Sequence, residues 1–83
     1  MIEKQVQELI EKSIIEENYI LDEVKYVKEG SQMFLRIVID KEGIVDVSDT
    51  VKVFHIVNKI LDEKDPIKEA YILDVCSKEK GRE

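Results

Sequence analysis

The sequence predicts an α+β fold: a two-layer α/β sandwich with the order α-β-β-α-β, in which a three-stranded sheet carries both helices on one face. Two segments place apolar residues at the helical spacing of three and four, and three others alternate apolar and polar residues as strands do. A length of 83 residues with 43% hydrophobic residues suits one core. We therefore expect one α/β domain over residues 1–77 and a polar C-terminal tail over 78–83.

The first helix is expected from residue 2 to about residue 17. Its apolar residues fall on one helical face and should form a core stripe: Ile2, Val6, Leu9, Ile10 and Ile14. Asn18 follows this segment, and asparagine tolerates the left-handed backbone conformation that often closes a helix. The chain should then become extended.

A β-hairpin is expected over residues 19–39. The first strand covers residues 19–28, and its opening residues are out of phase with the later ones, which indicates a bulge or a late start near Asp22. Gly30 can adopt the positive φ that a tight turn requires. The second strand covers residues 33–39, where aliphatic residues alternate between two faces.

A second helix and a third strand complete the expected fold. Ser48 is the expected N-cap, and the helix must have ended by Pro66, because the residue before proline avoids the α region. The expected core stripe of this helix consists of Val53, Phe54, Val57, Ile60 and Leu61. In the third strand, Tyr71, Leu73 and Val75 alternate with Ile72, Asp74 and Cys76.

Strand alternation also predicts what the outer sheet face carries. If Leu35, Ile37 and Ile39 point at the helices, an apolar patch with a few charges is left on the other face. The candidate partner-binding residues on that face are Phe34, Arg36, Val38, Ile72 and Asp74. Either a partner covers them, or a different strand register packs them inside the fold.

The net charge of −6 restricts the possible partners. An acidic domain repels phosphate backbones and anionic lipid, so we expect little direct nucleic-acid binding and attraction to a basic protein. No apolar run approaches the roughly 18 residues of a membrane span, and the polar residues 3–5 do not fit a signal peptide, so we expect neither a membrane span nor export. The single cysteine forms no internal disulfide, which fits a reducing cytoplasm.

Catalytic, metal and cofactor sites are not expected. His55 is the one histidine and should lie on the solvated side of its helix, while Cys76 should act as a small apolar residue. Four acidic residues could suggest a cation loop, but they lack the ligand pattern of calcium-binding loops: Asp40, Glu42, Asp46 and Asp49. The sequence therefore predicts no enzyme and no bound cofactor.

Three ordered segments carry a family resemblance. They are residues 24–30 (VKYVKEG), residues 35–43 (LRIVIDKEG), and the pair 61–67 (LDEKDPI) and 71–75 (YILDV). Together these resemble the N-terminal domain of the RimP family of ribosome maturation factors. The resemblance implies an α-β-β-α-β domain without enzymatic activity that takes part in maturing the small ribosomal subunit.

The resemblance also implies a second domain, a small β-barrel, joined through a Ser-Ser-Pro-Gly segment. The sequence departs from that pattern at residues 76–82 (CSKEKGR), and we therefore expect the barrel to be absent. It departs again at Phe54 and His55, where the family tends to place Ser-Arg.

Two functional hypotheses follow. The first is a non-catalytic, cytoplasmic assembly factor that binds the small ribosomal subunit through a basic ribosomal protein. The alternative is a self-associating protein-interaction module without a ribosomal role, in which the open sheet face or the edge strands pair in a homodimer.

Overall fold

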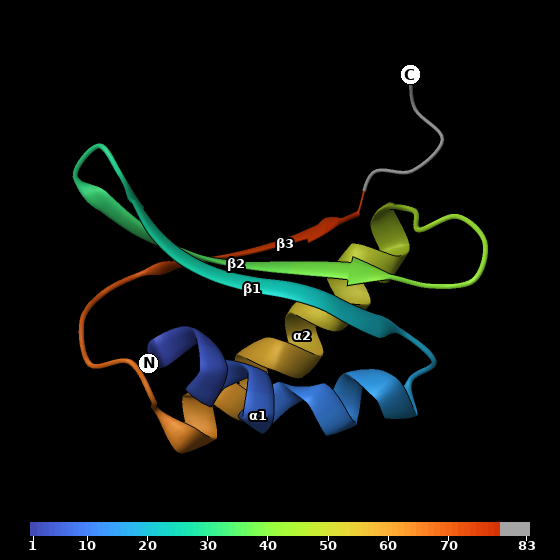
Figure 1. Cartoon of the computed structure of the whole chain (residues 1–83), viewed down its shortest axis with the longest axis horizontal. Helices are drawn as coiled ribbons and strands as arrows, with labels where there is room; N and C mark the ends of the chain where they lie inside the picture. The colour runs from blue at the N-terminus through green and yellow to red at the C-terminus, as the bar shows by residue number, and fades with distance from the viewer. Residues whose placement is uncertain (79–83) are drawn as a thin grey trace.

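A three-stranded sheet lies against two helices in the computed structural model, which describes residues 1–78 (Figure 1). The elements are α1 (Ile2–Glu16), β1 (Ile20–Glu29), β2 (Gln32–Asp40), α2 (Val47–Lys64) and β3 (Ile72–Ser77). Both helices pack on the same side of the sheet, α1 against β1 and α2 against β3. The predicted α+β order is therefore confirmed. The predicted polar tail begins at Lys78, and the part of it after Lys78 lies outside the described residues.

Helix α1 turns directly into the hairpin. Asn18 has φ 70°, so it adopts the left-handed conformation expected for a residue that closes a helix. Gly30 has φ 64° in the turn between β1 and β2. The two strands are antiparallel, and their register shifts between Leu21 and Glu23, so of the two alternatives predicted near Asp22, a bulge or a late start, the structure has the bulge.

The start of α2 differs from the prediction, because Asp46 and not Ser48 is the N-cap. The Asp46 side chain accepts a hydrogen bond from the Asp49 backbone N–H, and the Asp49 side chain accepts one from the Asp46 N–H. This reciprocal capping box satisfies two free backbone N–H groups. The Ser48 hydroxyl instead donates a hydrogen bond to Asp46 Oδ1. The helix ends at Lys64, before Asp65 in the left-handed conformation with φ 48°.

Helix α2 returns the chain to the sheet so that β3 lies parallel to β2. The strand order is β1-β2-β3, which makes β2 the central strand and β3 an edge strand. A parallel pair requires a crossover connection, and α2 is that connection.

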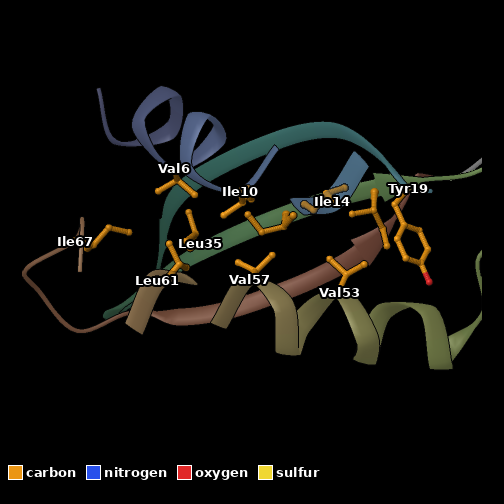
Figure 2. Packing of buried hydrophobic residues seen from close by; sticks show 11 residues of the cluster. Val6, Ile10, Ile14, Tyr19, Leu35, Val53, Val57, Leu61 and Ile67 are labelled. Carbon is orange, nitrogen blue, oxygen red and sulfur yellow. The ribbon is translucent and has the colours of Figure 1, made fainter. Parts of the chain in front are cut away.

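The core lies between the sheet and the two helices (Figure 2). Leu35, Ile37 and Ile39 of β2 are fully buried there, as strand alternation predicts. The other buried hydrophobic residues come from both helices and their adjoining loops: Val6, Ile10, Ile14, Tyr19, Val53, Val57, Leu61 and Ile67. Phe54 was expected in this stripe but is only half-buried and lies outside the core cluster, beside β3.

Candidate interaction surface

The sheet face opposite the helices, here called the uncovered face, brings together the five residues predicted as a partner site. Strand pairing aligns its side chains in three rows that cross the sheet from β1 to β3. The rows are Val27, Phe34 and Ile72; then Lys25, Arg36 and Asp74; then Glu23, Val38 and Cys76. Neither helix lies on this side of the sheet (Figure 1).

The middle row is organised around Arg36. Its Nε atom donates to Asp74 Oδ2 at 2.9 Å, and its Nη1 atom lies 3.4 Å from Glu29 Oε2. The guanidinium carbon is 5.8 Å from the centre of the Phe34 ring, a cation–π distance. The hydrogen bond to Asp74, followed by that to Glu29, raises the pKa of Arg36. Three neighbours therefore hold the arginine in place on the uncovered face.

Apolar side chains flank this charged row on both sides. Phe34 and Val27 are half-buried, and Ile72 beside them is 41% exposed. Val38 and Cys76 form a second, half-buried apolar pair at the other end. An arginine and an aromatic ring among aliphatic residues match the composition of protein interface cores.

Cys76 contributes apolar surface to this face rather than a reactive thiol. Burial, followed by the nearby Asp74 carboxylate, raises the pKa of the Cys76 thiol. A thiol of that kind is mostly protonated at neutral pH, and the protonated form is a poor nucleophile.

His55 is exposed on α2, as predicted, and its ring meets the Phe54 ring edge-on at 5.9 Å. Within residues 1–78 no three histidine, cysteine, aspartate or glutamate side chains are grouped as a metal site. None of the helices in this part of the chain has the length and apolar character of a membrane span.

Sequence reasoning missed a polar cluster around Asp49. The Tyr19 hydroxyl donates to Asp49 Oδ1 at 2.6 Å, and Lys41 Nζ lies 2.9 Å from Asp49 Oδ2. The bond from Tyr19, followed by those from the Asp46 N–H and Lys41, holds the pKa of Asp49 well below its usual range. The same bond raises the pKa of Tyr19 to about 12. The spacing of Asp46 and Asp49 was the available signal, since it matches a capping box.

This cluster joins three parts of the chain. Tyr19 follows α1, Lys41 follows β2, and Asp49 lies in the first turn of α2. It therefore acts in holding the fold together, and the uncovered face remains the candidate functional surface.

Comparison with protein families gives one result that bears on identity. Residues 9–78, which are most of the chain, match the model of the RimP N-terminal domain. The match includes both strands of the hairpin, all of α2, and β3. The chain therefore belongs to the RimP N-terminal domain family, the family of ribosome maturation factors that its sequence motifs resemble.

Proposed function

We propose that this domain is a non-catalytic assembly factor that binds a basic protein of the small ribosomal subunit through the uncovered face. Family membership over residues 9–78 carries the proposal, because it connects the chain with ribosome maturation. The proposed place of action is the cytoplasm, where ribosomal subunits assemble.

The charge of the domain supports a basic protein as the partner. Nineteen acidic residues against 13 basic ones leave a net charge of −6. Such a domain attracts basic proteins over long range and repels exposed nucleic-acid backbones, so we propose a protein contact rather than direct RNA binding.

The uncovered face supports the proposal by its composition and its rigidity. Phe34 and Arg36 lie on the central strand, and the ion pair from Arg36 to Asp74 joins that strand to the edge strand β3. A partner that meets this face finds side chains already held in position, which lowers the entropy cost of binding.

The test uses a pull-down of reconstituted small subunits or immature precursors with the purified chain. Phe34→Asp should reduce recovery more than about tenfold, equal to about 1.4 kcal/mol of binding free energy, while far-ultraviolet circular dichroism shows an unchanged fold. Ile15→Asp is the matched control, since Ile15 is 57% exposed on α1, in the other layer. Both substitutions add the same charge, so a difference between them reports the contact itself.

Recovery of nothing above background with the unmodified chain would contradict the proposal. Equal recovery with both variants would show that the chain does not bind its partner through the uncovered face. An unfolded Phe34→Asp variant would show that Phe34 is required by the fold, and Phe34→Ala would then replace it in the same assay.

A second candidate function is self-association through the same face. The apolar residues Phe34, Val38 and Ile72 favour it, because a second copy would cover them in an isologous dimer. Light scattering over a range of concentrations separates the candidates: a mass that stays monomeric throughout contradicts self-association.

A further inference from the structure

The two edges of the sheet are protected differently. At the β1 edge, the Tyr26 backbone N–H donates to Glu3 Oε2 of α1 at 3.0 Å, and the bulge near Asp22 shifts the register of β1 against β2. A bulge and a side chain that occupies a free N–H are both devices that prevent further strand pairing. Within residues 1–78, no strand or side-chain bond to the backbone covers the outer edge of β3.

The backbone of β3 presents an alternating set of groups to that edge. The Lys78 N–H donates to the Ile39 carbonyl of β2 at 2.8 Å, which places the even-numbered residues of this segment in the β2 ladder. Successive residues in a strand direct their N–H and C=O groups to opposite sides. Leu73, Val75 and Ser77 therefore direct theirs to the free edge.

A groove runs beside the same edge. It has a volume of about 400 Å³ and is lined by residues of α2 and β3 alone: Thr50, Val51, Phe54, His55, Leu73, Asp74 and Val75. Val51 is 48% exposed on the α2 side of the groove. A strand paired with β3 would place every second side chain over Val51 and Phe54, where apolar groups fit.

Charge favours a basic occupant over a second copy of this chain. The carboxylates of Asp65 and Asp62 lie close enough to Tyr71, directly before β3, to raise the pKa of its hydroxyl after burial has done so. Asp74 lies within the strand, but its carboxylate is already paired with Arg36. Two copies paired along β3 would bring these carboxylates and two net charges of −6 together.

We infer that β3 binds an extended basic segment of a partner protein as a fourth strand, with alternate side chains in the groove beside α2. This inference rests on the proposed function and names how the partner binds. The added strand would lie next to Ile72 and Asp74, so it would extend the uncovered face and not compete with it.

The test uses the full chain and a peptide of about ten residues, at the upper end of ordinary strand length, in which lysine and valine alternate. Amide hydrogen exchange followed by nuclear magnetic resonance should slow at least about tenfold at Leu73, Val75 and Ser77 when the peptide is added. Exchange at Asp74 and Cys76, which already belong to the β2 ladder, should change less than about twofold. Slow exchange at the first three amides in the free chain would overturn the inference, because the edge would already be occupied.

Backbone N-methylation of the peptide distinguishes strand pairing from charge attraction. One peptide carries methyl groups on the valine nitrogens and another on the lysine nitrogens, so only one of them loses the N–H groups that face β3. Binding should fall more than about tenfold for one peptide and little for the other. Equal binding by both would show attraction by charge alone and overturn the strand, while leaving the proposed function intact.

Two protein variants complete the test. Val51→Arg places a positive charge in the groove and should weaken the lysine–valine peptide more than about tenfold, whereas Ile15→Arg on the solvent side of α1 should change binding less than about threefold. Equal effects would overturn the groove as the site. If Val51→Arg leaves subunit recovery unchanged while Phe34→Asp abolishes it, the proposed function stands and strand addition fails. A peptide-induced doubling of mass would point to a second copy and overturn the basic occupant.

Discussion

Removing the Tyr19 hydroxyl tests the polar cluster that joins α1, β2 and α2. In Tyr19→Phe the aromatic ring stays in the core, where Tyr19 is 6% exposed, and only the bond to Asp49 Oδ1 is lost. Asp49 Oδ2 keeps its contacts with the Asp46 N–H and Lys41. The substitution therefore leaves one oxygen of a largely buried carboxylate without its hydrogen-bond donor.

The expected cost follows from that geometry. A hydrogen bond to a charged group contributes about 1.5 to 3 kcal/mol, more than a neutral bond, because the ionised acceptor strengthens it. We expect Tyr19→Phe to lower the free energy of unfolding by about this amount at pH 7. For a domain of this size, each kcal/mol shifts the melting temperature by about 4 to 8 °C, so the shift should exceed about 5 °C.

The pH dependence has a definite sign at each end. Asp49 has a lowered pKa in the fold, so the stability it contributes is present above its ordinary value of 3.8 and declines as the pH falls below that value. Tyr19 has a raised pKa, so its contribution is complete below 10.0 and declines as the pH rises toward about 12. The difference between the unmodified chain and Tyr19→Phe should be constant between about pH 5 and pH 9 and smaller outside this range.

Urea unfolding followed by circular dichroism at several pH values measures this difference. Tyr26→Phe is the control, because the Tyr26 hydroxyl donates to Glu69 at 2.9 Å in an exposed position, where such a bond adds little stability. We expect that variant to unfold close to the unmodified chain. Equal losses in the two variants, or a Tyr19→Phe loss that grows as the pH falls below 3.8, would refute a stabilising role for the buried bond to Asp49.

Three further predictions concern the core, the thiol and the acidic loop. Leu35→Ala should lower the free energy of unfolding by about 2 to 5 kcal/mol in urea titrations, because it opens a cavity under the helices, while Val38→Ala on the uncovered face should cost less than Leu35→Ala. A reversed order would contradict the assigned sheet faces. Cys76 should react with iodoacetamide more slowly in the folded than in the urea-unfolded chain at pH 8, because burial raises its pKa; equal rates would contradict this. Calorimetry should detect no submillimolar binding of calcium or magnesium; such binding would assign a cation site to Asp40, Glu42, Asp46 and Asp49.

Local periodicity was sufficient to predict most of the fold. Apolar spacing of three and four identified α1 and α2, and alternation identified the strands, because each pattern reflects one element that buries a single face. Sequence reasoning also predicted the left-handed Asn18, the turn at Gly30 and the irregularity near Asp22. Each of these features depends on neighbours within a few residues along the chain.

The candidate surface was predicted in part. Alternation correctly placed Phe34, Arg36 and Val38 opposite Leu35, Ile37 and Ile39. It did not predict that Arg36 pairs with Asp74, since that contact depends on the alignment of two strands 38 residues apart. Their role in binding a partner remains a prediction.

The sequence by itself determined which segments are helices and strands, most of the residues that face the core, and which family the chain resembles. Only the tertiary structure decided that β2 is central and that β3 runs parallel to it. It also decided that Tyr19 meets Asp49 and that Glu3 occupies the Tyr26 N–H, whereas within residues 1–78 the outer edge of β3 has no such contact. The physical reason is range: helical and strand periods are written in neighbouring residues, whereas strand order, buried polar pairs and edge protection arise where residues distant in sequence meet in space.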